Sequence, residues 1–339
     1  VLRPEGGGRF ELNYSLMQSL FDLFTRSRRV AVADAAQARV QAEVMMQLVR
    51  IAQDTEAAYS EAITAKDTLR LQQELLALEQ NTLTLQTRLA RQGAVSNSVV
   101  ITQQSALAQQ TQLLRSLEAE HVKALSMLAQ QMGLATSKRM LLPDRLPAMQ
   151  LSVFDEPELQ ALAQKHRPEL LANNATIEQM RAEKNVQTGA LRNTEPLLGP
   201  AGVRESSGFS LNGLGAQITL PIFDTGRARS NLADAKISQA QFQAEATRRL
   251  IPLEVERALA ILIASTKALA QSDRNLKQQQ QLEKLALGNY KQGNGDYLRV
   301  VDAKRFRLSS QMQQIQAQQT LRAALVDLER ATGVAMQNQ

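Results

Sequence analysis

The sequence predicts a mainly helical protein with a small β part, built from long antiparallel helices. Three observations predict this fold class: Pro and Gly are absent over long stretches, apolar residues repeat by heptads, and the two halves of the chain resemble each other. Only 4% of the 339 residues are aromatic, whereas 44% are hydrophobic. This composition suits long helices packed side by side better than a thick globular core, and it excludes a disordered chain.

Short matches that follow the same order in both halves indicate an internal duplication. The matched segments are 20–22 with 222–224, 41–43 with 243–245, 91–93 with 291–293, and 128–134 with 328–334. The offset changes from about 202 to about 200 along the chain, so one small insertion or deletion separates the halves. We therefore expect two structural repeats that contain the same kinds of element.

The first repeat is predicted to span residues 1–134 and to begin with a strand at 9–20, where apolar and polar residues alternate. A long helix at 24–92 follows, because no Pro or Gly interrupts the segment. At ~1.5 Å per residue it would extend on the order of 100 Å. Its leucines form two adjacent heptad stripes, which give the helix a neighbour on each side, as in a bundle or a closed wall of helices. The stripes are Leu69, Leu76 and Leu83, and Leu71, Leu78 and Leu85.

A turn at Gly93 ends this helix, because glycine accepts a left-handed backbone at little cost. The return helix is predicted at 96–133, with Ser96, Asn97 or Ser98 as its N-cap. Residues 135–157 hold three prolines and are predicted to be the linker between the repeats.

The second repeat is predicted at 158–339, beginning with a helix at 158–191. Strands and a hairpin loop follow at about 188–222, where the Gly-, Pro- and Ser-rich stretch 195–208 reads as the exposed loop. The alternation of apolar residues changes phase at Gly213, which suggests a β-bulge or a bend.

The repeat continues with a long helix at 226–291, in which Pro252 predicts a kink. The return helix at 296–333 has Asp296 as its expected N-cap and ends near Gly333.

Several classes of function are disfavoured. The chain has no cysteine and only two histidines, His121 and His166, which are far apart; His121 reads as a packed helix residue. Basic and acidic residues are interspersed despite a net charge of +6, so no nucleic-acid surface is expected. No catalytic, metal or phosphate-binding motif occurs, and we expect no enzyme, no cofactor and no metal site. No apolar run is long enough for a transmembrane helix, so a membrane role would fall to strands.

Five features together are similar to the outer-membrane efflux protein family, whose best-known member is TolC. They are Arg167–Leu170, Leu220–Arg227, Tyr290–Gly293, Val300–Ala303, and the Leu-x4-Gly ending of both repeats. The resemblance covers nearly the whole chain. It implies a homotrimer in the outer membrane of a Gram-negative bacterium, with most of each chain in the periplasm. The strands would contribute to a shared β-barrel in outer-membrane lipid, and the long helices to a helical barrel that forms a periplasmic tunnel.

By the same resemblance, the chain would form a passive exit duct of a tripartite efflux or secretion system. A periplasmic adaptor would open a gate at the helix tips and link the duct to an inner-membrane pump. The implied adaptor-docking residues are Gly93, Ala94, Val95, Gly293, Asn294 and Gly295. The implied gate residues are Tyr290, Asp296, Arg299 and Asp302, with Asp296 or Asp302 pairing with Arg299.

The chain departs from the family pattern in three places. Arg299 stands where a second acidic gate residue is expected, and Gly295 where TolC has a tip arginine. A further helix and strand are expected before Arg9 but have no counterpart in the sequence, so either the first repeat is N-terminally incomplete or the barrel differs from four strands per protomer. Val1–Pro4 does not read as a signal peptide, so a mature or truncated chain is expected.

Two simpler interpretations remain open. The chain could be a soluble coiled-coil scaffold or adaptor without a pore, its strands forming a small sheet that caps a bundle. The tip residues could serve only as helix caps and i,i+3 pairs.

Overall fold

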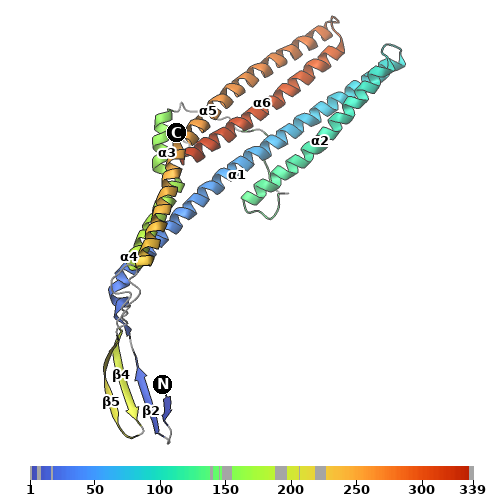
Figure 1. Cartoon of the computed structure of the whole chain (residues 1–339). Coiled ribbons are helices and arrows are strands. Elements are labelled where there is room, and N and C mark those ends of the chain that lie inside the picture. The colour runs from blue at the N-terminus through green and yellow to red at the C-terminus, as the bar shows by residue number, and fades with distance from the viewer. Residues whose placement is uncertain are drawn as a thin grey trace. The chain divides into compact units, whose positions relative to one another are not determined.

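The computed structural model describes residues 2–5, 9–16, 18–137, 140–144, 146, 155–187, 197–205, 207–217 and 227–335. Its helices are α1 (Leu20–Arg91), α2 (Asn97–Gln131), α3 (Glu156–His166), α4 (Pro168–Gln187), α5 (Arg227–Lys291) and α6 (Tyr297–Thr332). Its strands are β1 (Leu2–Glu5), β2 (Arg9–Ser15), β3 (Gln18–Ser19), β4 (Leu197–Glu205) and β5 (Ser210–Gln217). The fold is therefore mainly helical with one small sheet, as predicted (Figure 1).

The chain forms two compact units, and each unit combines segments from both halves of the sequence. The first unit contains Val1–Met46 and Pro168–Arg249, and the second contains Gln47–Arg167 and Leu250–Gln339. Helices α1 and α5 each contribute to both units, and α5 is continuous through Pro252, close to the boundary at Arg249. Among the described residues, no helix contains a stretch long and apolar enough to cross a membrane.

The first unit contains an antiparallel sheet in which β4 pairs with β2, β3 and β5, while β1 pairs with the other edge of β2. A strand therefore precedes Arg9, contrary to the expectation from sequence. The residues predicted as an exposed loop at 195–208 include the nine residues of β4, so that prediction was wrong. The predicted signature Leu220–Arg227 lies almost wholly outside the described residues.

The β4–β5 ladder has one continuous register through Gly213, which faces Ala201, so the bulge suggested there was wrong. The change of phase instead moves the apolar side chains of β5 from one face of the sheet to the other. Tyr14 lies over Gly202, where an added Cβ would approach the tyrosine ring to 2.6 Å. The hydroxyl of Tyr14 also donates to Asn212 on β5, which ties the three strands together.

Beside the sheet, the first unit contains the start of α1 together with α4 and the start of α5. Ile177 of α4 and Ala240 and Ala244 of α5 form its small apolar core. Nε of Arg39 on α1 donates to Oε1 of Gln179 at 2.6 Å, and so joins α1 to α4.

The second unit contains two helical hairpins, α1–α2 and α5–α6 (Figure 1). Small residues of α1 pack against Ala124 and Leu128 of α2. Leu71 of α1 packs against Leu308 and Ile315 of α6 and joins the two hairpins. Helix α1, which carries both heptad stripes of leucines, therefore has a neighbouring helix on each of two sides.

One predicted helix, 158–191, is two helices with a break at Arg167. Arg167 has an extended backbone (φ −62°, ψ 123°) because the ring of Pro168 disfavours the helical conformation of the residue before it. The predicted strand at 9–20 also ends early, since α1 begins at Leu20.

Candidate functional site: the hairpin tips

The turns at the ends of the two hairpins have the same backbone structure, 200 residues apart. Each turn carries a hydrogen bond from the glycine amide to the carbonyl three residues earlier and one from the next amide to the carbonyl five residues earlier. These are Gly93 N–Ala90 O (3.0 Å) with Ala94 N–Leu89 O (2.9 Å), and Gly293 N–Tyr290 O (3.0 Å) with Asn294 N–Asn289 O (2.9 Å). The backbone therefore satisfies its own hydrogen bonds and leaves the side chains free.

Glycine is required in these turns by conformation rather than by space. Gly93 has φ of 74° and Gly293 has φ of 77°, and no atom lies within 4 Å of a Cβ added to either. The predicted docking residues all lie in the two turns. Those on the first tip are Gly93, Ala94 and Val95, and those on the second are Gly293, Asn294 and Gly295.

The return helices begin with different caps. Oδ1 of Asp296 accepts a hydrogen bond from Leu298 N at 3.1 Å, which confirms Asp296 as the N-cap of α6. Ser96 is the N-cap residue of α2, but its side chain makes no cap hydrogen bond and lies 2.7 Å from the hydroxyl of Ser98. The second tip therefore has the better-anchored helix start.

The second tip also carries an aromatic pair. The rings of Tyr290 and Tyr297 meet edge to face, with centroids 5.4 Å apart and an interplanar angle of 61°. The pair joins the last turn of α5 to the first turn of α6. Ala90 and Asn97 occupy the corresponding positions of the first tip.

Asp302 belongs to a network of side chains from three helices. Its Oδ1 lies 3.1 Å from Nη1 of Arg305. The same guanidinium contacts both carboxylate oxygens of Glu79 on α1, at 2.7 and 2.5 Å. It also reaches Oε1 of Gln103 on α2, at 3.2 Å. The network joins the two hairpins below their tips.

The network holds Arg305 as a cation. Its hydrogen bonds with Glu79 are the largest influence on the pKa of Arg305 and raise it above the ordinary value, although burial acts in the opposite direction. Glu79 is buried, with 4% of its surface exposed, and this arginine offsets the hydration that its carboxylate loses on burial.

Arg299 forms no ion pair within the described residues, although the sequence suggested a pair with Asp296 or Asp302. Asp296 instead caps the helix, and Asp302 pairs with Arg305. The structure thus brings Asp302 into a network but leaves Arg299 exposed. Arg305, Glu79 and Gln103 were not predicted as site residues from the sequence. Only the i,i+3 spacing of Asp302 and Arg305 gave a signal, because Glu79 lies 226 residues from Arg305.

The histidines lie away from the tips. His121 is half-buried on α2, and burial, followed by the charge of Lys66, lowers its pKa below 6.5. His166 ends α3. In the part of the chain that the structure describes, no three His, Cys, Asp or Glu residues gather in a way that could hold a metal ion.

The Arg-Pro-Glu-Leu segment contacts the end of the last helix. Arg167 forms a salt bridge with Glu254 of α5. Gly333 ends α6 in a left-handed conformation, with φ of 72°. A Cβ at Gly333 would lie 2.8 Å from His166 O and 2.9 Å from Arg167 Cα. Two of the motifs that suggested the family are therefore in contact.

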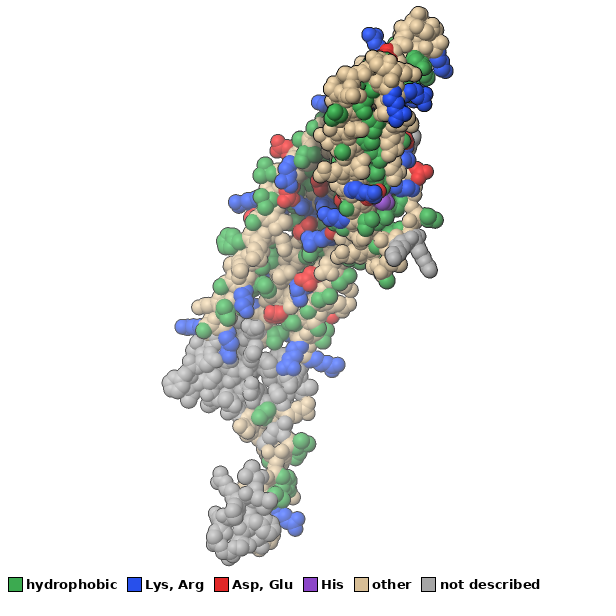
Figure 2. Space-filling model, turned by 90° about the vertical axis from the view of Figure 1, so that its right-hand side faces the viewer, with side chains coloured by type: hydrophobic (Ala, Val, Ile, Leu, Met, Phe, Trp, Pro, Cys, Tyr) green, Lys and Arg blue, Asp and Glu red, His purple; other side chains and the backbone are tan. Residues whose placement is uncertain are grey.

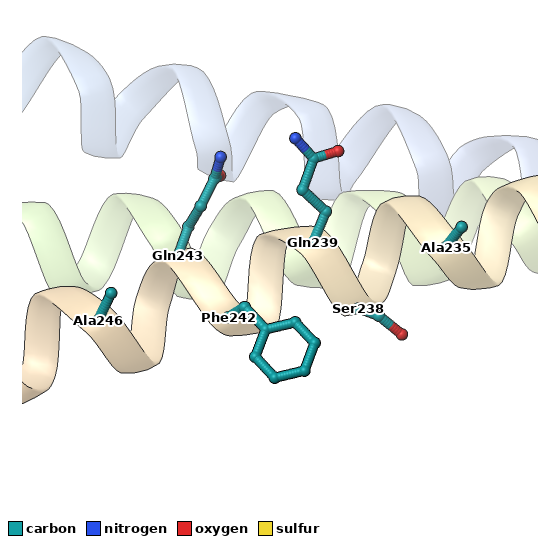
Figure 3. A pocket seen from close by; sticks show the side chains of 6 residues that line it. All are labelled: Ala235, Ser238, Gln239, Phe242, Gln243 and Ala246. Carbon is teal, nitrogen blue, oxygen red and sulfur yellow. The ribbon is translucent and has the colours of Figure 1, made fainter.

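A hollow of about 620 Å³ in the first unit is lined by one helix only. Its residues are Ala235, Ser238, Gln239, Phe242, Gln243 and Ala246 of α5. Figure 3 shows Phe242 pointing away from the neighbouring helices, while Gln239 and Gln243 point to the other side. Phe242 is 76% exposed, so this is an open helix face rather than an enclosed ligand site.

A model of the outer membrane efflux protein family matches residues 159–334, which is more than half of the chain. The chain belongs to this family. A relative, the outer membrane protein OprJ of Pseudomonas aeruginosa, is 34% identical over 122 residues, 34% of this chain and 25% of OprJ. The match thus spans a quarter of that relative's length.

Solved structures of outer-membrane channels share the fold. The outer-membrane channel OprN is 22% identical with a TM-score of 0.74, and the match covers 99% of this chain and 80% of OprN. The MtrE outer membrane channel of Neisseria gonorrhoeae is 20% identical with a TM-score of 0.73, covering 100% of this chain and 80% of MtrE.

Family membership confirms two predictions from sequence. The outer membrane efflux family is not a family of enzymes, so the chain is not one. The protein is an efflux-family protein of the outer membrane of a Gram-negative bacterium.

Proposed function

We propose that this chain is one protomer of a homotrimeric exit duct that carries substrate across the periplasm and the outer membrane. A periplasmic adaptor at the hairpin tips would open the duct and connect it to an inner-membrane pump. Beside family membership, one observation carries the proposal: the second unit is a row of four helices with an apolar face left open at each end.

The order of the row follows from side-chain contacts. Helix α1 contacts α2 through Gln72 and Gln110, whose side chains are hydrogen-bonded at 2.7 Å. It contacts α6 on its other side through the cluster around Leu71. Helix α6 contacts α5 through Arg307 and Glu283, 2.7 Å apart. The order is therefore α2–α1–α6–α5, with α2 and α5 at the edges.

Both edges carry apolar residues that nothing in the described chain covers. On α2, Ile101 and Val122 are both 61% exposed and lie three heptads apart, so they share one face. On α5, the exposed apolar residues of the second unit include Leu253 (61%), Leu282 (52%) and Leu285 (56%). Leu253 and Leu282 are 29 residues apart, about eight helical turns, and also share a face.

Two different apolar edges on one chain suit a head-to-tail interface. The α2 edge of one copy would pack against the α5 edge of the next, and a ring closes when the rotation between copies allows it. A closed ring of helices encloses a tunnel. The number of three copies comes from the family resemblance.

The sheet of the first unit offers an apolar face for lipid. Partners in antiparallel strands project to the same side, so the register places Leu12, Tyr14, Leu16, Leu198 and Leu214 on one face. All five are exposed, from 38% for Leu12 to 83% for Leu214. Contact with the acyl chains of the outer membrane would bury them.

The tips are the proposed site of adaptor docking and of the gate. Docking would involve the turns around Gly93 and Gly293, where Ala94 and Asn294 are exposed and Val95 is half-buried. The Asp302–Arg305–Glu79 network supports the gate proposal, because it connects the two hairpins, which must separate if the tips open. The Tyr290–Tyr297 pair holds the two helices of the second hairpin together at its tip.

We also propose that the chain is a duplicated repeat, with residues 1–134 and 158–339 as the two copies and 135–157 as the linker. The matching turns at Gly93 and Gly293 support this division. So do the helix ends at Gly133 and Gly333, which have φ of 68° and 72°.

The edge interface can be tested by crosslinking, since the chain has no cysteine of its own. Ile101→Cys and Leu285→Cys place one thiol near the tip on each edge. A short bismaleimide should link full-length protein in detergent into dimers and trimers. The matched control, Ile101→Cys with Leu253→Cys, separates the thiols along the helices by roughly 50 Å and should give no link. Equal yields from both pairs would contradict the interface.

The duct itself is tested by single-channel conductance in a planar lipid bilayer, with Asp302→Ala alongside. Discrete openings that the variant enlarges would support a gate at the tips. Openings that the variant leaves unchanged would keep the duct and remove Asp302 from its gate. Folded, inserted trimers without any conductance would favour a scaffold that has no pore.

A further inference from the structure

The hairpin ends carry an excess of positive charge. Residues 79–103 and 283–307 contain eight basic and four acidic side chains. No acidic residue occurs between Glu79 and Glu118, so the first tip has arginines but no carboxylate. Figure 2 shows Lys and Arg side chains outnumbering Asp and Glu at this end of the hairpins.

The four acidic side chains are all engaged. Glu79 and Asp302 both pair with Arg305, and Glu283 pairs with Arg307 at 2.7 Å. The carboxylate of Asp296 caps α6. Six of the eight basic residues form no ion pair within the described residues. They are Arg88, Arg91, Lys284, Lys291, Arg299 and Lys304.

Arg299 is the least expected of these cations. Arg88, Arg91 and Lys291 lie in the last turns of α1 and α5, where a positive charge complements the helix dipole. Arg299 lies in the first turn of α6, where the helix dipole makes a positive charge unfavourable. This first turn contains no acidic residue. It is exposed, three residues from Asp302 on the same helix. Helix stability therefore does not explain it.

We infer that the tip end of the proposed duct selects anions, so that its preferred cargo is negatively charged, with Arg299 as the main determinant. The inference rests on the proposed function, since only a pore that passes the tips has an entrance there. Rings of like charge in a low-dielectric opening concentrate the opposite ion. In a closed ring of copies Arg299 would recur around the opening. Arg305 balances only one of its two carboxylate partners, Glu79 and Asp302, but the eight basic side chains still outnumber the four acidic ones at this end.

The test is the reversal potential of the full-length trimer in a planar bilayer under a tenfold KCl gradient. The wild-type protein should pass chloride in preference to potassium. Arg299→Gln should lower the chloride-to-potassium permeability ratio at least about twofold. The matched control Lys267→Gln removes another exposed cation, on α5 and roughly 36 Å from the tip, and it should leave the ratio unchanged.

The outcomes separate the two proposals. A conducting pore that prefers potassium overturns anion selection but keeps the duct. A chloride preference that Arg299→Gln and Lys267→Gln alter equally overturns the role of Arg299. Absence of any conductance from inserted trimers overturns the duct and the inference together.

Discussion

The two hairpins have the same backbone turns but different side chains around them. At the first tip, α2 starts at Ser96 without a side-chain cap hydrogen bond, whereas Asp296 caps α6 at the second. At the far ends of the return helices, Gly133 has open space around it, whereas Gly333 touches the α3–α4 junction. The comparison teaches that glycine and local hydrogen bonds fix the hairpin shape, while side chains determine what each hairpin contacts.

The largest expected effect concerns the network that joins the hairpins. Arg305→Ala should lower the free energy of unfolding by about 3 kcal/mol, because it leaves the buried carboxylate of Glu79 without its cation. Thermal unfolding in detergent, followed by circular dichroism, measures it. The double variant Glu79→Gln with Arg305→Ala should recover at least half of the loss. A double variant as unstable as the single one would show that the charge of Glu79 is not the cause.

The next effect separates the two glycines that end the return helices. Both have a left-handed backbone, so alanine at either position costs about 1 kcal/mol. Gly333→Ala should cost about 2 kcal/mol more than Gly133→Ala, because only its Cβ would collide with His166 and Arg167. Unfolding midpoints of the two variants measure the difference. Equal losses would mean that the backbone at the α3–α4 junction moves away.

A smaller difference is expected at the caps. Asp296→Ala should cost about 1 kcal/mol, since it removes the hydrogen bond to Leu298 N. Ser96→Ala should cost less, because its side chain makes no cap hydrogen bond. The same unfolding measurement compares them. If Ser96→Ala lowered the free energy of unfolding more than Asp296→Ala, the first tip would have the more stabilising N-cap, contrary to this prediction.

The smallest effect depends on pH. His121 corresponds to Leu321 in the second half, at the offset of 200. Burial lowers the pKa of His121 below 6.5, so the unfolded chain binds this proton more readily than the folded chain. Its stabilising contribution is therefore present above pH ~6.5 and is lost as the pH falls through the lowered pKa.

His121→Leu should remove this dependence and narrow the gap between unfolding midpoints measured at pH 5 and pH 7.5. His166→Leu is the control, because His166 lies at the exposed end of α3. If His166→Leu narrowed the difference between the two midpoints and His121→Leu did not, the pH dependence would not come from His121.

Features determined by neighbouring residues were predictable from sequence. The turns at Gly93 and Gly293 and the cap at Asp296 depend on conformations that few residue types adopt, and the structure has them where expected. The break at Arg167 follows from the same kind of local rule, since proline restricts the residue before it, although one continuous helix was predicted there.

Features determined by distant residues were not predictable. Strand β4 contains Gly199, Pro200 and Gly202, which read as a loop, and it is a strand because β2 and β5 pair with it. The bond of Arg305 with Glu79 joins residues 226 positions apart, and nothing in the sequence connects them. Among the proposed gate residues, the family resemblance pointed to Asp302, but Arg305 was not predicted as its partner within the chain.

The self-contained turns have a consequence for how such a protein changes over time. Each tip forms its own backbone hydrogen bonds around one glycine. Substitutions at the other tip residues can therefore change the exposed side chains one at a time while the backbone of the turn stays the same. Within the same short turn, the residues that determine the shape differ from those that contact a partner. A lineage of such hairpins can therefore exchange one partner for another while its shape stays constant.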